Sequence, residues 1–518
     1  MGFISLNFCE KFPYLWNHID KIYIISSFIS YLFIGFSLFP KLFKNKKNKS
    51  SKSVDTSNLN LFVGNNKNGE DIYVPEYGLY QNFLITGTIG SGKTSSAMYP
   101  FTNQLIQYNF GLKNTIGMLI LDVKGNFYKQ VKLYCSSYNR NDDLIIIELG
   151  GKYKYNPLHK PNLKPAVLAN RLKTILTLFS PQTSESYWLD VAEQALCEAI
   201  KFCRIYNNGY VNFIELHKLI NFPNYYFQKI DYVRKLFSEN KLSPKDLFDL
   251  NSSIDFFQNE FFSLDSRTLS ILKSEISRIT NIFISDYDIQ KTFCPTENEI
   301  NFLGFSDVID KHKIVVLNMN IALYNNLSKI IAAYLKLDFQ SEVLGRLENN
   351  KINTTAFICD EYHEYVTSTD SAFFAQSREA KCINIISTQS YSSLVNALKD
   401  TSSANVIIHN LVNKLWLRTD DKLTIEDAQK QLGKEEKEKV STSISENAKE
   451  TNFDFFTNTL RSKNSNISES ISSYTQSDYI YDTNFFTQKL ETFSCLAFLS
   501  DGSSIIKPQK IYLKPYFK

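Results

Sequence analysis

Residues 87–94 read Gly87-Thr88-Ile89-Gly90-Ser91-Gly92-Lys93-Thr94, and an apolar run, Phe83-Leu84-Ile85-Thr86, comes directly before them. The pattern is G-x-x-x-x-G-K-[ST] in its expected setting, with a strand before it and a helical pattern after it. Its glycines let the backbone curl until successive N–H groups point at phosphate oxygens. A chance Gly/Ser turn is a poor alternative because the chain has only 18 glycines in 518 residues. The stretch therefore predicts a phosphate-binding loop.

Each position of this loop has an expected role. Lys93 would reach the β- and γ-phosphates of ATP, and the Thr94 hydroxyl would ligate Mg²⁺. ATP with Mg²⁺ is thus the predicted cofactor pair. The residues expected to bind the nucleotide are Gly87, Thr88, Ile89, Gly90, Ser91, Gly92, Lys93, Thr94 and Ser95.

Apolar runs on both sides of the loop predict a parallel α/β sheet. A strand buried on both faces reads as a continuous apolar run, and alternation of strands with helices produces parallel sheets. The strand-like runs are 116–122, 144–149, 313–318, 356–361 and 383–387, with two later ones at 493–499 and 505–513. Helices are expected at about 93–108, where Pro100 should introduce a kink, and at about 322–347.

The segment from 166 to 300 has a different character. Continuous strand runs disappear, and helical spacing replaces them, as in Trp188, Val191 and Leu196. We expect an all-α domain whose many aromatic residues form its core. It divides a nucleotide-binding domain into a first part, 61–165, and a second part, 301–518. Residues 434–480 are charged and then rich in Ser, Asn and Thr, which fits either an exposed hairpin or a disordered loop.

The N-terminus carries one membrane signal, the uncharged segment Ile22 to Phe39. As a helix it would span ~27 Å, about the thickness of a bilayer core. Six lysines lie between Lys41 and Lys52, so the positive-inside rule places the rest of the chain in the cytoplasm. We expect a short extracytoplasmic segment at 1–21, a transmembrane helix at 22–40, a basic linker at 41–60 and a single-pass location in the inner membrane. A buried core helix is the alternative.

The composition sets few limits on function. A net charge of +4 neither requires nor excludes nucleic acid, because a basic channel can lie inside a nearly neutral protein. The eight cysteines include no C-x-x-C pair, and no Cys/His cluster has metal-ligand spacing. Reduced, buried thiols in a cytosolic compartment are therefore expected.

Hydrolysis of ATP needs an acid at a strand end for the Mg²⁺ shell and usually a base that orients water. Asp360 and Glu361 supply both at the end of one strand, so we assign the metal shell to Asp360 and the water to Glu361. Asp122, which ends another strand, is the competing acid. Gln389 is a candidate sensor of the γ-phosphate. Arg378, expected on the intervening helix, is a candidate for stabilising transition-state charge, within or across subunits.

In their order and spacing these features resemble the type IV secretion coupling ATPases, the VirD4/TraG/TraD family of conjugative DNA transfer. The similarity covers about residues 60–516, behind the N-terminal anchor. The matching pieces are Gly87–Thr94 with Pro100 downstream, Asp122-Val123-Lys124-Gly125, Asn156-Pro157-Leu158, the helical insertion opening near Tyr187-Trp188, Asp360-Glu361, Arg378, Ser387-Thr388-Gln389-Ser390 and the tract Asn413 to Gly433.

The resemblance implies a membrane-anchored homo-hexameric ring with a RecA-like nucleotide domain and an all-α domain facing the cytoplasm. Members of the family bind a relaxase–DNA complex and deliver it to the secretion channel. The implied partners are therefore DNA, bound without sequence specificity, the relaxase–DNA complex and type IV secretion channel components. Many members have two membrane helices where one is found here, and some have an extended C-terminal tail. The resemblance therefore predicts least about which channel components the chain contacts and which substrate it selects.

Two other functions remain open at the level of sequence. A double-stranded DNA translocase of the FtsK/HerA type would share the core, although the large helical insertion and Asp122-Val123-Lys124-Gly125 favour the coupling family. A non-catalytic membrane receptor for secretion substrates would also bind nucleotide. Glu361 beside Asp360 argues against that receptor, because a protein that only binds nucleotide needs no base.

Overall fold

The computed structural model describes residues 59–112, 114–179, 186–238, 242–348, 352–447, 452–454, 459–461 and 466–517. The predicted extracytoplasmic segment 1–21, the transmembrane helix 22–40 and nearly all of the basic linker 41–60 lie outside these ranges. Within the ranges, no helix is both long enough and apolar enough to cross a membrane.

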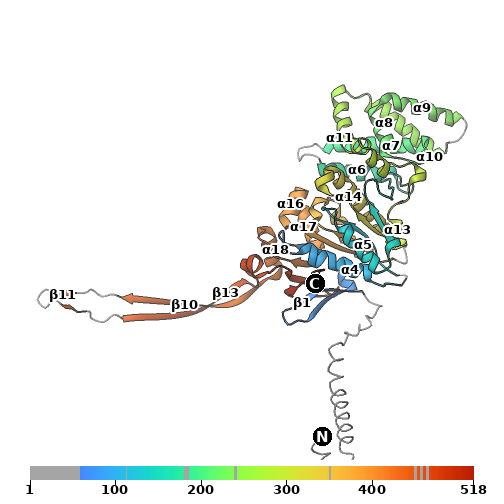
Figure 1. The fold of residues 1–518 in the computed structure, drawn as a ribbon. Coiled ribbons are helices and arrows are strands. Elements are labelled where there is room, and N and C mark those ends of the chain that lie inside the picture. Colours follow the sequence, from blue (N-terminus) through green and yellow to red (C-terminus); the bar gives the residue numbers. More distant parts are fainter. Residues whose placement is uncertain are drawn as a thin grey trace, which may run out of the picture. The chain divides into compact units, whose positions relative to one another are not determined.

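The apolar runs of the sequence form strands of one eleven-stranded sheet, most of which is parallel (Figure 1). The parallel strands follow the order β9-β3-β8-β7-β4-β6-β5. The predicted α/β class with a large parallel sheet is confirmed. The strands are β3 (Phe83–Thr86), β4 (Gly117–Leu121), β5 (Leu144–Ile147), β6 (Ile314–Leu317), β7 (Thr355–Cys359), β8 (Cys382–Thr388) and β9 (Asn413–Trp416).

An antiparallel extension continues the sheet beyond β9. Strand β14 (Ser494–Ser500) pairs with β9, and then follow β15 (Ile505–Tyr512), β1 (Asn60–Asn66) and β2 (Asp71–Pro75). The sequence predicted β14 and β15 but missed β1, β2 and β9, whose polar residues interrupt the apolar pattern. Because β14 lies beside β9, the last part of the chain comes close to the loop that follows β3.

Alternate residues of the parallel strands enter cores on opposite faces of the sheet. In β3, Phe83 and Ile85 belong to one core and Leu84 to the other. In β4, Met118 and Ile120 face the first core, whereas Leu119 faces the second. Both sets are almost completely buried, which is why these strands read as continuous apolar runs.

Helices cover both faces of this sheet (Figure 1). The loop after β3 enters a wide π-type turn, Thr94–Met98, and then α4 (Tyr99–Gln107). Pro100 therefore lies in the first turn of α4, where its missing N–H is tolerated. The helix is irregular in the π-type turn before Pro100, and the kink predicted at Pro100 itself is not observed. The other helices around the sheet are α3 (Glu76–Leu79), α5 (Phe127–Ser137), α13 (Ser306–Asp310), α14 (Ile321–Leu344), α15 (Asp370–Gln376), α16 (Tyr391–Leu398), α17 (Thr401–Asn410) and α18 (Lys422–Leu432).

Helices without intervening strands fill the segment for which the sequence predicted an all-α domain. They are α6 (Pro165–Phe179), α7 (Ser186–Tyr206), α8 (Phe213–Asn221), α9 (Pro223–Ser238), α10 (Pro244–Asp255), α11 (Ser266–Ile284) and α12 (Tyr287–Phe293). Aromatic residues such as Phe256, Phe257 and Phe261 are buried in their core. A buried ion pair of 2.9 Å between Arg171 of α6 and Asp338 of α14 ties this region to the sheet.

A two-stranded antiparallel ribbon follows α18. Strand β10 (Lys434–Asn447) pairs with β13 (Asn466–Tyr479) from Lys434↔Tyr479 to Asn447↔Asn466. Two short strands, β11 (Asn452–Asp454) and β12 (Thr459–Arg461), pair with each other in the segment between them. Val440 is 66% exposed and Ile471 is 67% exposed. Of the two structures that the sequence left open here, the chain adopts the exposed hairpin (Figure 1).

Candidate nucleotide-binding site

The register of the parallel strands brings most of the predicted site residues together at the carboxyl-terminal ends of the strands. Thr86, the last residue of β3, pairs with Thr388 of β8 and with Trp416 of β9. On the other side of β8, Cys359 of β7 pairs with Ile386. The residues that follow these strands therefore emerge together, among them Gly87, Asp360 and Gln389.

The loop after β3 is held from both sides by backbone hydrogen bonds. Gly87 N–H donates to the Gln389 carbonyl at 3.2 Å, and Thr88 N–H donates to the Arg418 carbonyl at 2.8 Å. Gly90 and Gly92 have φ angles of 78° and 101°, which disfavour other residues. A Cβ atom at Gly92 would also lie 2.5 Å from the Phe493 ring. Both glycines are thus required by the shape of the loop.

Lys93 folds back over the loop. Its Nζ donates to the Gly87 carbonyl at 2.6 Å, and the side chain is 5% exposed. Burial lowers the pKa of Lys93, and the nearby carboxylates of Glu361 and Asp360 oppose that shift. Burial thus destabilises the charged form of Lys93, and an anion bound beside the ammonium group would stabilise it.

The two predicted Mg²⁺ ligands touch each other. Thr94 Oγ1 donates a hydrogen bond of 2.7 Å to Asp360 Oδ2. The other oxygen of Asp360 accepts hydrogen bonds from the Ser387 hydroxyl and from the Glu361 N–H. A hydroxyl and a carboxylate at this separation fit Mg²⁺, which takes one or two protein oxygens together with phosphate oxygens and water. No larger His/Cys/Asp/Glu cluster suited to a metal occurs within the described ranges.

Glu361 has an unusual backbone and an unsatisfied side chain. Its φ and ψ angles of 52° and 49° are left-handed, a conformation that costs a non-glycine residue free energy. It is 9% exposed, and its Oε2 has no hydrogen-bond partner among the described residues. Burial raises the pKa of Glu361, as does the Asp360 carboxylate, while Lys93, Lys124 and a hydrogen bond from Gln389 act in the opposite direction.

A buried ion pair anchors the segment that follows Glu361. Lys336 of α14 lies 2.5 Å from the Asp370 carboxylate, and both side chains are completely buried. Lys336 also donates to the Tyr365 carbonyl at 2.6 Å, and the Tyr362 hydroxyl donates to Asp370. Burial lowers the pKa of Lys336, and the Asp370 carboxylate opposes that shift. Glu361 is thus held in its strained conformation by a rigid neighbouring segment.

Asp122, the competing acid, is occupied by the backbone. Its Oδ1 accepts the Lys124 N–H at 3.1 Å, and its Oδ2 accepts the N–H groups of Asn126 and Phe127 at 3.0 and 3.1 Å. Burial and the nearby Asp360 raise its pKa, and these three N–H groups lower it. The carboxylate therefore shapes the turn between β4 and α5, which leaves the Thr94 contact to Asp360.

Arg378 lies far from the other predicted site residues of its own chain. It is exposed in the turn after α15, and not on a helix as expected, because α15 ends at Gln376. Cys382, the first residue of β8, donates its N–H to the Ser377 carbonyl at 3.0 Å. Strand β8 has seven residues, a length of roughly 20 Å. Arg378 thus lies at the amino-terminal ends of the parallel strands. The other predicted residues, Lys93, Thr94, Asp360, Glu361 and Gln389, lie at their carboxyl-terminal ends.

A cavity of about 290 Å³ opens beside the loop. The predicted residues Gly87, Ser91, Asp360 and Gln389 lie next to it without lining it. The Ser91 hydroxyl is turned into the loop and donates to the Thr88 carbonyl at 2.7 Å. The cavity is lined by the predicted Thr88, Ile89, Gly90, Gly92, Lys93, Thr94, Ser95 and Glu361, together with Tyr99, Lys124 and Tyr516.

Sequence reasoning missed the last three of these residues as parts of the site. Lys124 carried a signal, because it follows a predicted strand of the same parallel sheet. Tyr99 reads as an ordinary residue of the helix after the loop. Tyr516 has no signal at all, because it is separated from the loop by most of the chain.

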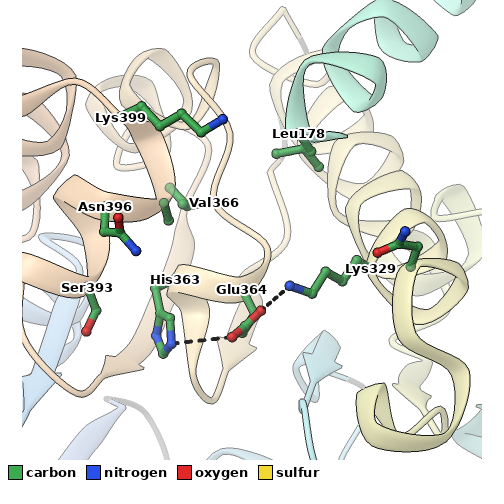
Figure 2. A pocket seen from close by; sticks show the side chains of 10 residues that line it. Leu178, Lys329, His363, Glu364, Val366, Ser393, Asn396 and Lys399 are labelled. Carbon is green, nitrogen blue, oxygen red and sulfur yellow. Dashed lines mark ion pairs between the residues drawn. The ribbon is translucent and has the colours of Figure 1, made fainter. Parts of the chain in front are cut away.

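A second, larger cavity of about 550 Å³ lies beyond His363 (Figure 2). His363 Nδ1 is 3.7 Å from Glu361 Oε2, and its Nε2 is 3.7 Å from Glu364. Figure 2 shows Glu364 between His363 and Lys329, and Lys329 Nζ is 2.5 Å from the carboxylate. Burial lowers the pKa of His363, so the neutral ring separates Glu361 from this cavity.

A sequence family described as the TraM recognition site of TraD and TraG matches residues 354–480. This region runs from β7 to the second strand of the ribbon. The predicted resemblance to the coupling proteins is confirmed. No curated protein matches the chain.

Solved structures of the coupling protein TrwB and of VirB4 share the fold. The bacterial conjugative coupling protein TrwB, in its unbound monoclinic form, has a TM-score of 0.57 and 13% identity, with 92% of this chain and 91% of that chain covered. TrwB in complex with ADP and Mg²⁺ has a TM-score of 0.54 and 13% identity over 85% and 87% of the two chains. VirB4 of Thermoanaerobacter pseudethanolicus has a TM-score of 0.50 and 14% identity over 88% and 96%. The coupling-protein fold thus extends over the sheet that carries the loop.

Proposed function

We propose that this chain is a Mg²⁺-dependent ATPase of the coupling-protein type. The observation that carries the proposal is Glu361, which lines the cavity beside the phosphate loop and whose buried Oε2 has no hydrogen-bond partner in the described chain. Desolvating such an oxygen costs free energy unless a bound molecule satisfies it. A water molecule aligned for attack on phosphate is such a partner.

The loop binds the phosphates. Its curled backbone presents N–H groups to them, and Lys93 leaves the Gly87 carbonyl for the β- and γ-phosphates, since an anion attracts the ammonium more strongly than a neutral carbonyl does. Thr94 and Asp360 would hold Mg²⁺, which neutralises charge on the β- and γ-phosphates when it is bound.

Glu361 and Gln389 act on the attacking water. The Glu361 carboxylate accepts a hydrogen bond from the water and takes its proton as the bond to phosphorus forms. Gln389, whose carbonyl accepts the Gly87 N–H of the loop, would orient Glu361 through its side-chain amide. The left-handed backbone at Glu361 turns the side chain back toward the cavity, which accounts for a strained residue at this point.

The test is phosphate release by the full-length chain with ATP and Mg²⁺. Lys93→Ala should lower both ATP affinity and turnover, the latter by roughly 10²-fold or more, because a preorganised cation is lost from the phosphates. Lys129→Ala is a matched control, since Lys129 is exposed on α5. If the wild-type chain binds ATP but releases no phosphate, with or without DNA, it is a nucleotide-binding receptor and the ATPase proposal fails.

We further propose that hydrolysis drives the transfer of a relaxase–DNA complex to a type IV secretion channel by a homo-hexameric ring. Two observations support this role: the coupling-protein fold and the match of residues 354–480 to a region described as a TraM recognition site. The DNA should be held through its phosphates, so binding should weaken steeply with salt and depend little on sequence. DNA would also stimulate the ATPase activity of a translocase of the FtsK/HerA type. Such a translocase, however, would be dispensable for conjugation in cells.

We propose that residues 22–40 anchor the chain in the inner membrane with its bulk in the cytoplasm. The apolar run Ile22 to Phe39 and the lysines between Lys41 and Lys52 support this orientation. Alkaline carbonate washing should leave the full-length protein in the membrane fraction. Protease added outside spheroplasts should spare everything after Lys41, and digestion of the body under these conditions would reverse the proposed topology.

A further inference from the structure

The chain after β15 crosses the phosphate loop and is bound to it by backbone hydrogen bonds. Phe493 N–H donates to the Ser91 carbonyl at 3.2 Å, and Leu513 N–H donates to the Phe493 carbonyl at 2.8 Å. Tyr516 N–H donates to the Ser95 carbonyl at 2.9 Å. The backbone of Leu513 and Tyr516 is therefore held near the loop, through Phe493 and through Ser95.

Tyr516 places an aromatic ring at the nucleotide cavity. The ring lines this cavity and is 46% exposed. On the protein side it meets the Tyr99 ring nearly at right angles, with 5.2 Å between the ring centres, and Tyr99 itself is 8% exposed. The Phe517 ring packs against it at 5.3 Å. Two rings thus support Tyr516, and Tyr516 lines the cavity.

The direction of a bound nucleotide follows from the residues on the two sides of the loop. Asp360 and Glu361 lie where hydrolysis takes place, so the γ-phosphate belongs at their end. Lys93 and Thr94 serve the β- and γ-phosphates. Ser95, the next residue, lies beyond them along the chain, and its carbonyl holds Tyr516. A triphosphate held by Lys93 and Thr94 would then carry its sugar and base toward Ser95 and Tyr516, which line the same cavity.

We infer that Tyr516 is the platform on which the base of the bound nucleoside triphosphate stacks, an inference that rests on the proposed nucleotide site. An aromatic ring offers a large apolar face to a base. Stacking is tolerant of base identity, because every base has such a face. The site therefore takes nucleoside triphosphates with little preference between adenine and guanine, and the loop residues supply the affinity for phosphate.

The test separates the base from the phosphates by comparing ATP, GTP and inorganic tripolyphosphate, each with Mg²⁺, as ligands of the full-length protein. Tyr516→Ala should weaken ATP and GTP binding by similar factors of roughly 5- to 150-fold, the range for the loss of one base–aromatic stack. Tripolyphosphate affinity should stay unchanged, because the Tyr516 N–H keeps its bond to Ser95. Tyr516→Phe should keep ATP affinity within about twofold, since the ring remains. Tyr287→Ala, which removes a tyrosine that is 73% exposed on α12, is the matched control.

Each other outcome has a definite meaning. If Tyr516→Ala weakens ATP and tripolyphosphate equally, the ring only supports the loop and the inference is wrong. It is equally wrong if neither ligand is affected. If the wild-type protein binds no triphosphate of any kind, the nucleotide site itself fails. If wild type binds ATP through Tyr516 without hydrolysing it, the base platform stands and only the proposed ATPase activity is lost.

Discussion

Replacing Glu361 by glutamine is expected to lower ATP turnover by roughly 10²- to 10⁴-fold, the contribution of a positioned general base, with ATP affinity almost unchanged. The amide cannot take a proton from water, whereas Thr94 and Asp360 still form the Mg²⁺ site and Lys93 still faces the phosphates. The measurements are steady-state phosphate release and the dissociation constant for ATP. Wild-type turnover in Glu361→Gln would refute the assignment of the base.

The matched control is Glu364→Gln. Glu364 follows three residues later on the same anchored segment, but it pairs with Lys329 at the second cavity. Its replacement should leave turnover within a few-fold of wild type. The comparison separates a chemical role from a general effect of removing a negative charge near the sheet edge.

The pH dependence adds a second readout. Burial raises the pKa of Glu361, and the base works only as the carboxylate. Turnover should therefore fall as the pH drops through this raised pKa, above the range of an ordinary glutamate. The acid limb should persist in Glu364→Gln and be absent from the residual activity of Glu361→Gln. A limb that survives in Glu361→Gln would belong to another group.

Arg378→Ala is expected to bind ATP normally and to hydrolyse it roughly 10³-fold more slowly, the lower end of the effect of an arginine finger. Within its own chain, Arg378 lies about one strand length away from Lys93 and Glu361, roughly 20 Å. Arg378 can reach a bound phosphate only if a ring of subunits brings the amino-terminal strand ends of one subunit to the phosphate loop of the next. The structure thus argues against action of Arg378 within its own subunit, and its action on a neighbouring subunit stays a prediction.

A mixture of two inactive variants tests this directly. Rings formed from Lys93→Ala and Arg378→Ala subunits contain boundaries where an intact Lys93 faces an intact Arg378 of the neighbouring subunit. DNA-stimulated ATPase should partly recover at these boundaries. Replacing the Lys93→Ala partner by the Lys93→Ala/Arg378→Ala double variant should abolish the recovery, because no such boundary can form. No recovery in rings shown to be mixed would place Arg378 outside the chemistry.

Much of the sheet was predictable because its parallel strands are buried on both faces. Residues such as Leu119 and Ile120 then stand next to each other as a continuous apolar run.

Strand β9 was missed for the opposite reason. It begins with Asn413 and Lys414, which are buried but polar. Asn413 is satisfied by the Gly78 carbonyl at 2.8 Å and the Ser500 N–H at 2.8 Å, and burial lowers the pKa of Lys414 to about 8. Such partners come from distant parts of the chain.

The sequence by itself determined the phosphate loop and the pairing of Asp360 with Glu361. Both depend on neighbouring residues, namely glycine spacing after an apolar strand and two acids at the end of another. The sequence also favoured Asp360 over Asp122, but only the tertiary structure supplies the contacts: the Asp122 oxygens accept backbone N–H groups of their own turn, while Asp360 meets Thr94. The tertiary structure also decided that Arg378 lies away from the phosphate loop of its own chain and that Tyr516 lines the cavity. Tyr516 reaches the loop only because β14 and β15 extend the sheet beside β9, and strand pairing between distant segments has no local signal in the sequence.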